Sequence, residues 1–460
     1  MIVVSHRGPV SFQQDPEGSF TARRGAGGVV SALAPLLAGR GETQWIAAAL
    51  TDDDRAAVAA GAVVVDGLDV SLLALDPEVH RLHYDVISNR ILWFCFHGLF
   101  DLPREPVFNP ALHEAWDAYR AVNRQFALAV AETAPEGDVV LVQDLQLLLV
   151  PRFLSELRPD LAISHFTHTP FCGPNSIRVL PDHIAEELCQ SLSGTAAGFH
   201  STRWVRAFEA SAVEVLGVSP PTAFCATFGP DPEDLAATAG SVAAAESYAA
   251  FDARVGDRRC IVRTDRMELS KNITRGFVAF DELLDQHPEQ RERVTFVAML
   301  NPSREGLAEY RDYRVEVEAT AARVNDRWAT SDWEPIIVDT RDDFPRSVAA
   351  LQRADVMLVN PVKDGLNLVA LEGPLLNQRD AVLCLSREAG AFDRLSNDCV
   401  PVQPFDTSQT AAALHTALSM DRGERRARAA GLRAAALARP ASVWLDELVS
   451  RARGAQPRFG

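Results

Sequence analysis

The segment that says most about the fold covers residues 355–378 and reads DVMLVNPVKDGLNLVALEGPLLNQ. Its apolar run at 356–359 has the length of a buried strand, and the Asp364-Gly365 pair that follows is typical of a turn. Apolar residues then recur at helical spacing from residue 366 onward. The pattern predicts a strand, a loop and the start of a helix, which is the junction where open α/β sheets bind ligands.

This junction carries groups that suit a phosphate and a sugar. The backbone N–H groups of residues 365–368 precede the first full helical turn, so they can face a phosphate. Asp364 and Glu372 accept hydrogen bonds when ionised, which suits sugar or ribose hydroxyls. The alternative is an ordinary strand-to-helix turn whose carboxylates favour the helix N-terminus, and the segment alone leaves both interpretations open.

The composition restricts the kind of protein to expect. The 460 residues suffice for two or three domains with their own cores. A net charge of −17, from 45 basic and 62 acidic residues, disfavours nucleic acid and anionic membranes as partners. Seven cysteines without a C-x-x-C pair fit reduced thiols in a cytoplasmic protein. The sequence shows neither a signal-peptide pattern nor an apolar run long enough for a membrane span.

Strand-like and helix-like patterns alternate along the chain. The strand-like runs cover residues 2–4, 139–142, 162–166, 196–199, 260–263, 294–298, 336–338, 356–359, 382–385 and 400–402. Such alternation favours doubly wound parallel sheets. The pattern lapses near residues 229–232, so we expect two Rossmann-like α/β domains, 1–228 and 229–440, and a further helix in 441–460. Two such domains are expected to face a ligand-binding cleft.

Several cations follow predicted strands. Arg266 and Lys271 lie five residues apart on one loop, where a guanidinium fork and an ammonium suit a diphosphate. A solvated basic surface loop is the alternative. Arg304 and Arg7 follow other predicted strands and are weaker candidates for the same role.

Other motifs are less specific. The glycine-rich loop at 24–28 feeds a helical pattern and can approach a phosphate or sugar closely, although a tight turn explains it equally well. Asp144 ends an apolar run, where a carboxylate can bind a sugar hydroxyl or act as a base, or cap a helix. His165 and His168 lack a third ligand nearby, so no metal site is predicted there.

The aromatic residues Tyr84 and Trp93 flank residues 88–89, which we interpret as a looped or hairpin-like segment. They are either core residues or contacts to a carbohydrate or phosphate. The sequence shows no serine triad, P-loop or zinc spacing. An anion site with several carboxylates and no evident nucleophile fits group transfer from a nucleotide-activated donor.

Taken in order, these motifs resemble those of the trehalose-6-phosphate synthase family, the retaining GT-B glycosyltransferases of family 20, in its actinobacterial-type branch. The matching segments are residues 3–7, 25–28, 84–93, 144, 168–171, 265–271, 302–304 and 364–372. The resemblance covers nearly the whole chain. It implies two Rossmann-like domains facing a cleft, with the terminal helix around Trp444 returning to the first domain.

The resemblance also implies a role for each matching residue. The donor nucleotide sugar would be bound by Gly27, Gly28, His168, Arg266, Lys271, Asp342, Asp364, Gly365, Leu366, Asn367, Leu368 and Glu372. The acceptor glucose 6-phosphate would be bound by Arg7, Tyr84, Trp93, Asp144 and Arg304. Catalysis would depend on Asp144, His168, Arg266, Lys271 and Asp364.

The implied reaction transfers glucose, with retained configuration, from a nucleoside-diphosphate glucose to glucose 6-phosphate. The leaving diphosphate takes the acceptor proton, so neither an enzymic nucleophile, a metal nor a further cofactor is required. A homo-oligomer is compatible with the family. A carboxylate such as Asp342 suits the N1–H and amino groups of guanine, which favours GDP-glucose over UDP-glucose.

The chain departs from the family pattern at several positions. Gln143 and Leu145 stand where the family has His and Tyr around Asp144, and His6 stands where it has Asn. The resemblance therefore leaves two alternatives open: a validoxylamine-phosphate-synthase-like pseudoglycosyltransferase with a cyclitol acceptor, and a non-catalytic sugar-phosphate sensor. A complete set of donor contacts argues against the sensor.

Overall fold

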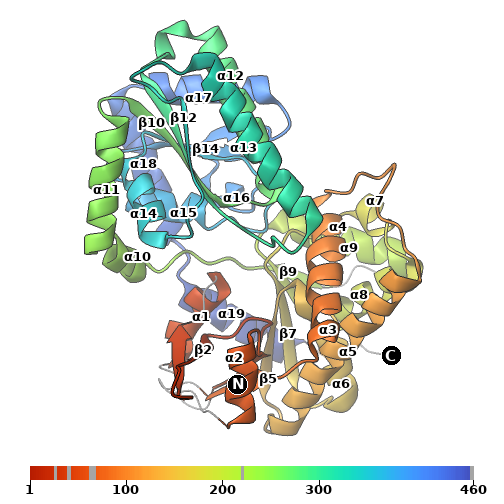
Figure 1. The fold of residues 1–460 in the computed structure, drawn as a ribbon. Coiled ribbons are helices and arrows are strands. Elements are labelled where there is room, and N and C mark those ends of the chain that lie inside the picture. Colours follow the sequence, from red (N-terminus) through yellow and green to blue (C-terminus); the bar gives the residue numbers. More distant parts are fainter. Residues whose placement is uncertain (25–27, 39–42, 62–68, 219–221, 456–460) are drawn as a thin grey trace. The chain divides into compact units, whose positions relative to one another are not determined.

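The computed structural model describes residues 1–24, 28–38, 43–61, 69–218 and 222–455. The chain divides into two compact units (Figure 1). Unit 1 comprises Met1–Phe228 and Ala441–Gly460, and unit 2 comprises Gly229–Pro440.

Unit 1 is built on a seven-stranded sheet in the order β5-β4-β1-β6-β7-β8-β9. The strands are β1 (Ile2–Val4), β4 (Gln44–Ala48), β5 (Asp69–Leu73), β6 (Val139–Gln143), β7 (Ala162–Thr167), β8 (Ala196–Phe199) and β9 (Ala223–Cys225). All neighbouring strands run parallel, and β1 and β6 are buried along their whole length, as expected for a sheet covered on both faces. A separate antiparallel hairpin joins β2 (Val10–Gln14) to β3 (Phe20–Arg24).

Helices connect the strands of unit 1. They are α1 (Gly28–Ala38), α2 (Asp52–Ala59), α3 (Pro77–Arg81), η1 (Leu82–Leu92), α4 (Trp93–His97), α5 (Pro110–Thr133), η2 (Leu145–Leu147), α6 (Val150–Leu157), α7 (Pro174–Ile177), α8 (Asp182–Ser193) and α9 (Thr202–Leu216). The last helix of the chain, α19 (Ala441–Gly454), packs against β6 and β7 of the same unit. Its Trp444 is buried and meets Phe166 edge-on, with 5.2 Å between the ring centroids.

The segment from residue 77 to residue 97 corrects one prediction. We expected the stretch between Tyr84 and Trp93 to be looped or hairpin-like, but it is helical, and its central element, η1, is a π-helix of 11 residues. The turn-like residues Ser88 and Asn89 are buried inside it, and Ser88 Oγ donates to the carbonyl of His83 over 2.8 Å. Because its hydroxyl is hydrogen-bonded within the helix, Ser88 does not indicate a turn here.

Unit 2 has a six-stranded parallel sheet in the order β12-β11-β10-β13-β14-β15. The strands are β10 (Arg259–Arg266), β11 (Val294–Asn301), β12 (Ile336–Asp339), β13 (Val356–Val359), β14 (Val382–Ser386) and β15 (Val400–Val402). The helices are α10 (Pro232–Ala239), α11 (Val242–Val255), η3 (Leu269–Lys271), α12 (Ile273–Gln286), η4 (Pro288–Gln290), α13 (Ala308–Trp328), α14 (Phe344–Arg353), α15 (Val369–Leu376), α16 (Phe392–Leu395), α17 (Thr407–Ser419) and α18 (Arg422–Leu437).

Successive strand residues of unit 2 point to opposite faces of the sheet. Val262 enters a core formed with α11, α14, α15 and α18, whereas its neighbour Ile261 enters a core formed with α12, α13 and α17. Figure 1 shows these two helix layers on either side of the sheet. The prediction of α/β units with parallel, doubly wound sheets is confirmed.

Both sheets have a point where the strand order reverses. In unit 1 it lies between β1 and β6, and in unit 2 between β10 and β13. The loops that leave two such strands diverge to opposite faces, which opens a crevice at their carboxyl ends where ligands bind. None of the helices in the described ranges has the length and apolar character needed to cross a membrane.

Candidate functional site

An ion pair lies at the reversal point of unit 2. Lys271 follows β10 and Asp364 follows β13, and Lys271 Nζ donates to Asp364 Oδ2 over 2.6 Å. Both side chains are largely buried, with 14% and 15% of their surface exposed. Burial alone would lower the pKa of Lys271, but the charges of Asp364, Asp265 and Glu268 outweigh it and raise the pKa. Lys271 is therefore a fixed cation at the carboxyl edge of the sheet.

A buried guanidinium holds the loop that carries Lys271. Arg263 of β10 donates to the carbonyl of Lys271 over 2.9 Å and to Asp265 Oδ2 over 2.7 Å. The next residue, Asn272, has a left-handed backbone with φ of 59° and anchors the loop through its side-chain amide to the carbonyl of Asn360. Because Asn360 follows β13, this bond ties the two loops together.

The loop after β13 positions Asp364 by a second set of contacts. The Asp364 N–H donates to the carbonyl of Glu388 over 3.1 Å. Asn367, with φ of 71°, donates from Nδ2 to Asp364 Oδ2 over 3.1 Å and accepts from the N–H of Ala370 with Oδ1. One amide thus orients the carboxylate and also satisfies a backbone N–H in the first turn of α15.

A close backbone contact fixes the path of this loop. A Cβ atom on Gly390 would lie 1.9 Å from the carbonyl oxygen of Gly365, so no larger residue fits there. The backbone N–H groups of Leu366, Asn367 and Leu368 donate to no other group in the described part of the chain. This is the arrangement expected for N–H groups that meet a phosphate at a helix start.

Glu268 is a residue that sequence reasoning missed. It is fully buried, and its Oε1 lies 3.0 Å from Arg266 Nη1, 3.8 Å from Arg304 Nη1 and 3.0 Å from Ser303 Oγ. Burial would raise its pKa, but the charges of Arg266, Arg304 and Lys271 bring the pKa to about 2. Glu268 therefore holds the two predicted arginines side by side. The sequence feature that could have identified Glu268 is its position, as an acidic residue two positions after Arg266.

Glu372 lies in the first turn of α15, as predicted. Burial, and then the nearby charge of Asp234, raise the pKa of Glu372 to about 7. Once ionised, the carboxylate can accept hydrogen bonds from both hydroxyls of a vicinal diol. The structure thus brings five predicted residues of unit 2 to the carboxyl edge of its sheet: Arg266, Lys271, Arg304, Asp364 and Glu372.

Asp342 lies beyond β12, at the same edge. Its Oδ1 accepts from Asn301 Nδ2 over 2.9 Å, and the side chain is exposed. Its neighbour Asp339 is buried and paired with Arg341 and Arg346. Burial would raise the pKa of Asp339, but hydrogen bonds from Arg341 and Arg346 lower it to about 2. Of the carboxylates here, Asp342 is the one turned to solvent.

In unit 1, Asp144 and His168 meet after β6 and β7. Asp144 has a φ of 70°, and its Oδ1 accepts from the backbone N–H of His168 over 3.2 Å. His168 Nε2 lies 3.0 Å from Gln143 Oε1, and Nδ1 lies 3.0 Å from His200 Nε2. An amide oxygen only accepts, so Nε2 carries the proton and Nδ1 accepts from His200.

His168 is therefore a neutral, fully engaged imidazole. Burial lowers its pKa to about 3, and both ring nitrogens have partners. A sugar hydroxyl that bonded to this ring would replace Gln143 or His200. The residue that departs from the family pattern, Gln143, is the one that sets the tautomer.

The predicted acceptor residue Tyr84 stacks on His6, with 4.4 Å between the ring centroids and 8° between the planes. His6 Nε2 lies 2.8 Å from His80 Nε2, and the pKa of His6 is well below its ordinary value because of burial and the charges of His83 and His80. Arg7, the next residue, is exposed. The chain after β1 thus places the stacked rings of His6 and Tyr84 next in sequence to the exposed guanidinium of Arg7.

Trp93 follows η1 directly. It is buried, with its ring 4.2 Å from that of His97. A π-helix closes its hydrogen bonds from residue i to i+5 and has a wider turn than an α-helix, so residues nine apart lie about two turns along the same face. Tyr84 and Trp93 are spaced in this way. The predicted Gly27 lies outside the described residues, and Gly28 begins α1.

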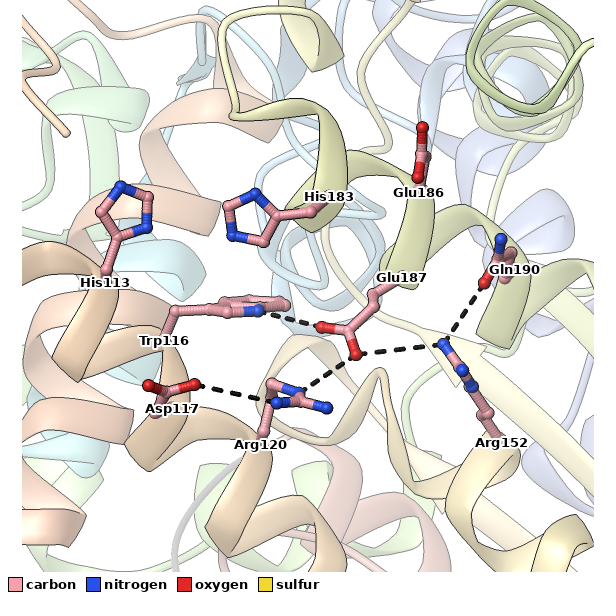
Figure 2. A pocket seen from close by; sticks show the side chains of 9 residues that line it. All are labelled: His113, Trp116, Asp117, Arg120, Arg152, His183, Glu186, Glu187 and Gln190. Carbon is pink, nitrogen blue, oxygen red and sulfur yellow. Dashed lines mark hydrogen bonds and ion pairs between the residues drawn. The ribbon is translucent and has the colours of Figure 1, made fainter.

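A pocket of about 430 Å³ lies elsewhere in unit 1, among α5, α6 and α8 (Figure 2). It contains none of the predicted site residues. Glu187 is its centre, accepting from Trp116 Nε1 and pairing with Arg120, each over 3.0 Å. His113 and His183, which also line it, stack with 5.5 Å between their ring centroids.

Comparison with known proteins places the chain among glycosyltransferases. Residues 1–453 match the family model described as glycosyltransferase family 20. A relative from Schizosaccharomyces pombe, named alpha,alpha-trehalose-phosphate synthase (UDP-forming), is 31% identical over 93% of this chain and 85% of its own. A relative from Mycobacterium sp. (strain KMS), named trehalose-6-phosphate synthase, is 31% identical over 99% and 96% of the two chains.

Solved structures show the same fold. An alpha,alpha-trehalose-phosphate synthase (UDP-forming) from Burkholderia vietnamiensis is 28% identical, with a TM-score of 0.83 over 98% of this chain and 99% of that one. One from Burkholderia xenovorans, in complex with glucose-6-phosphate, is 26% identical, with a TM-score of 0.83 over 98% and 100%. The predicted fold class, two Rossmann-like domains of the GT-B type, is confirmed by these matches and by the two parallel sheets.

Proposed function

Because the chain belongs to glycosyltransferase family 20, we propose that it transfers glucose from a nucleoside-diphosphate glucose to glucose 6-phosphate, with retained configuration, and so forms trehalose 6-phosphate. The observation that carries the proposal is the Lys271–Asp364 pair at the reversal point of unit 2. It combines a cation for a diphosphate with a carboxylate for a sugar at the place where such sheets bind nucleotides.

Unit 2 is assigned to the donor. Lys271 and Arg266 would bind the diphosphate together with the unpaired N–H groups of residues 366–368, and Asp364 would accept from glucose hydroxyls. Glu372 would bind the ribose. The lysine has three donor hydrogens, so it can keep its bond to Asp364 while it contacts a phosphate.

Unit 1 is assigned to the acceptor, within residues 1–228 together with the helix of 441–460. Arg7 would bind the phosphate of glucose 6-phosphate, with Tyr84 and Trp93 against the sugar and Asp144 on a hydroxyl. Arg304, from unit 2, is assigned to the acceptor phosphate as well. The glucose-6-phosphate complex of a 26% identical relative supports this substrate.

The reaction mechanism depends on whether any carboxylate of unit 2 is available as a nucleophile or is already held in an ion pair. A retaining enzyme that works by double displacement needs a carboxylate nucleophile. In the described part of unit 2, Asp364 is held by Lys271 and Glu268 by two arginines, so neither is placed as a nucleophile. The cations instead stabilise the negative charge that develops on the leaving diphosphate, which takes the proton of the acceptor hydroxyl on the same face.

Two observations bear on the base of the donor. Asp342 is an exposed carboxylate at the edge where the base is expected, and it suits the N1–H and amino groups of guanine. The relatives from Schizosaccharomyces pombe and Burkholderia are named UDP-forming. GDP-glucose is our proposal from Asp342, and UDP-glucose is the second candidate.

The test is to incubate the protein with glucose 6-phosphate and GDP-, UDP- or ADP-glucose, and to follow nucleotide release, product mass and the anomeric NMR signals. An α,α-linked disaccharide phosphate is expected. No turnover with any of these donors would refute the proposal. A parallel incubation with a GDP-linked cyclitol donor tests the pseudoglycosyltransferase, which turnover with that donor alone would support.

Variants make the test specific to the site. Lys271→Ala should raise the donor KM and lower kcat, because it removes the charge that meets the diphosphate. Arg254→Ala is the matched control, since it removes an exposed cation that pairs with Glu334 elsewhere in unit 2. Equal kinetics in the two variants would refute the diphosphate assignment.

A further inference from the structure

A second cluster of polar side chains in unit 2 has no role in the proposed reaction. His287 ends α12, Glu289 lies in η4 two residues later, and His415 lies on α17, which packs against α12. One ligand atom from each lies within 4.8 Å of the other two. We propose that these three side chains bind a divalent transition-metal ion of the zinc type.

The ligand set suits such an ion. Two imidazoles and one carboxylate are a recurring zinc set that leaves a fourth position for water. His287 Nδ1 lies 3.2 Å from Glu289 Oε1, close to the spacing of two atoms that are each about 2.0–2.2 Å from a tetrahedral ion. Among the described residues no other trio of His, Cys, Asp or Glu brings its ligand atoms this close.

Two further features of the cluster point to a cation. His415 Nδ1 is buried and has no hydrogen-bond partner in the described chain, so a lone pair or proton there is unsatisfied without a ligand. His287 is also the residue after the last turn of α12, where the helix dipole favours positive charge. An ion bound through His415 Nδ1 would satisfy both.

One movement is needed to form the site. The rings of His287 and His415 are stacked, with centroids 3.6 Å apart and planes 7° from parallel. An ion lies near the plane of each imidazole that binds it, so one ring must rotate about its Cβ–Cγ bond. The side chain of His287 is 29% exposed, so it is not fully enclosed by packing.

The site is remote from the candidate donor site of the same unit. Helix α12 begins two residues after Lys271 and has 14 residues, so its length of about 21 Å separates the two. The ion would link the end of α12 to α17. Its expected effect is on the stability of unit 2, and glucose transfer does not depend on it.

The test is calorimetric titration of the chelator-treated protein with ZnCl2, repeated with CoCl2 to record the visible spectrum of a tetrahedral cobalt site. Wild type should bind one ion and show that spectrum. Glu289→Gln and His415→Ala should each weaken binding at least about tenfold, the lower end of the cost of losing even an outer partner of a metal site. Glu289 is exposed, so its variant keeps the fold.

His183→Ala is the control, because it removes one ring of the stacked pair in the pocket of Figure 2, which lies in the other unit. It should bind zinc as wild type does. The proposal is overturned if wild type fails to bind zinc stoichiometrically, or if Glu289→Gln and His415→Ala bind it with unchanged affinity. Loss of binding in His183→Ala alone would place the ion elsewhere and would also overturn it.

Discussion

Replacement of Asp364 by asparagine separates the two functions that the structure joins in the Lys271–Asp364 pair. The amide has the same shape but no charge, so Lys271 loses its ionic partner at 2.6 Å. Under the proposed function, the lysine then serves the diphosphate alone. The sugar loses a charged acceptor at the same time. Binding of the nucleotide and transfer of glucose should therefore change in opposite directions.

The size of each effect follows from the contacts. A hydrogen bond to a charged group contributes about 1.5–3 kcal/mol, and about 1.4 kcal/mol is tenfold. Loss of the Asp364 contact to glucose should lower kcat/KM by about 10-fold to 150-fold. The affinity for the free nucleoside diphosphate should rise by up to about tenfold, because the like charge beside the phosphate has been removed.

Calorimetry with GDP and UDP, together with steady-state kinetics on the better glucose donor, gives both numbers for Asp364→Asn. Lys271→Ala is the comparison, since it should lower both nucleotide affinity and kcat/KM. The reasoning fails if Asp364→Asn weakens nucleoside-diphosphate binding as much as it weakens transfer. That result would mean that Asp364 acts on the phosphate side and not on the sugar.

Three other predictions concern the same edge of the sheet. Glu268→Gln should lower the free energy of unfolding by about 1–3 kcal/mol in urea titrations, because it removes the carboxylate that faces the largely buried guanidinium of Arg304. With a pKa of about 2 for Glu268, against an ordinary 4.5, the loss should be complete above pH 4.5 and shrink toward pH 2; an equal loss at pH 7 and pH 3 would contradict it. With a pKa of about 7 for Glu372, its ionised fraction rises about tenfold from pH 6 to pH 8, so nucleotide affinity should rise by up to that factor and Glu372→Gln should abolish the rise. Since burial raises this pKa, the group's contribution to stability is fully present below pH 4.5 and is lost as the pH rises through 7. Gly390→Ala should lower Tm and donor affinity, because its Cβ would lie 1.9 Å from the carbonyl oxygen of Gly365. Gly306→Ala is the control, since a Cβ there meets open space. Equal Tm values for the two variants would contradict the prediction.

Buried strands were predictable from the sequence because a parallel sheet makes them continuously apolar. The run at 356–359 became β13 without a change of boundary. The hairpin of β2 and β3 was not predicted, since its strands carry polar residues such as Gln13 and Arg23 and lie outside the main sheet. The helical character of η1 was missed because Ser88 and Asn89 are turn residues by local preference, and tertiary burial overrides that preference.

Site residues were predictable from the sequence where several reactive or charged side chains lie close together in one short motif. Lys271 and Asp364 were named separately, but their direct contact joins residues that are 93 apart in sequence. Glu268 and Gly390 escaped notice for a related reason. One is an ordinary acid until burial places two arginines on it, and the other matters only because a distant loop crosses it.

The division of the chain has a consequence for the order of events during synthesis. Unit 2 is continuous, from Gly229 to Pro440, whereas unit 1 needs the helix that begins at Ala441. In topology, unit 2 is therefore an insertion into unit 1. Domains fold as units while the chain emerges, so the later-made unit can be complete first. Until α19 arrives, Phe166, His168 and Phe228 lack the indole that covers them. Chaperones and proteases would meet unit 1 as an unfinished domain, with this aromatic surface uncovered, for as long as the ribosome is translating unit 2.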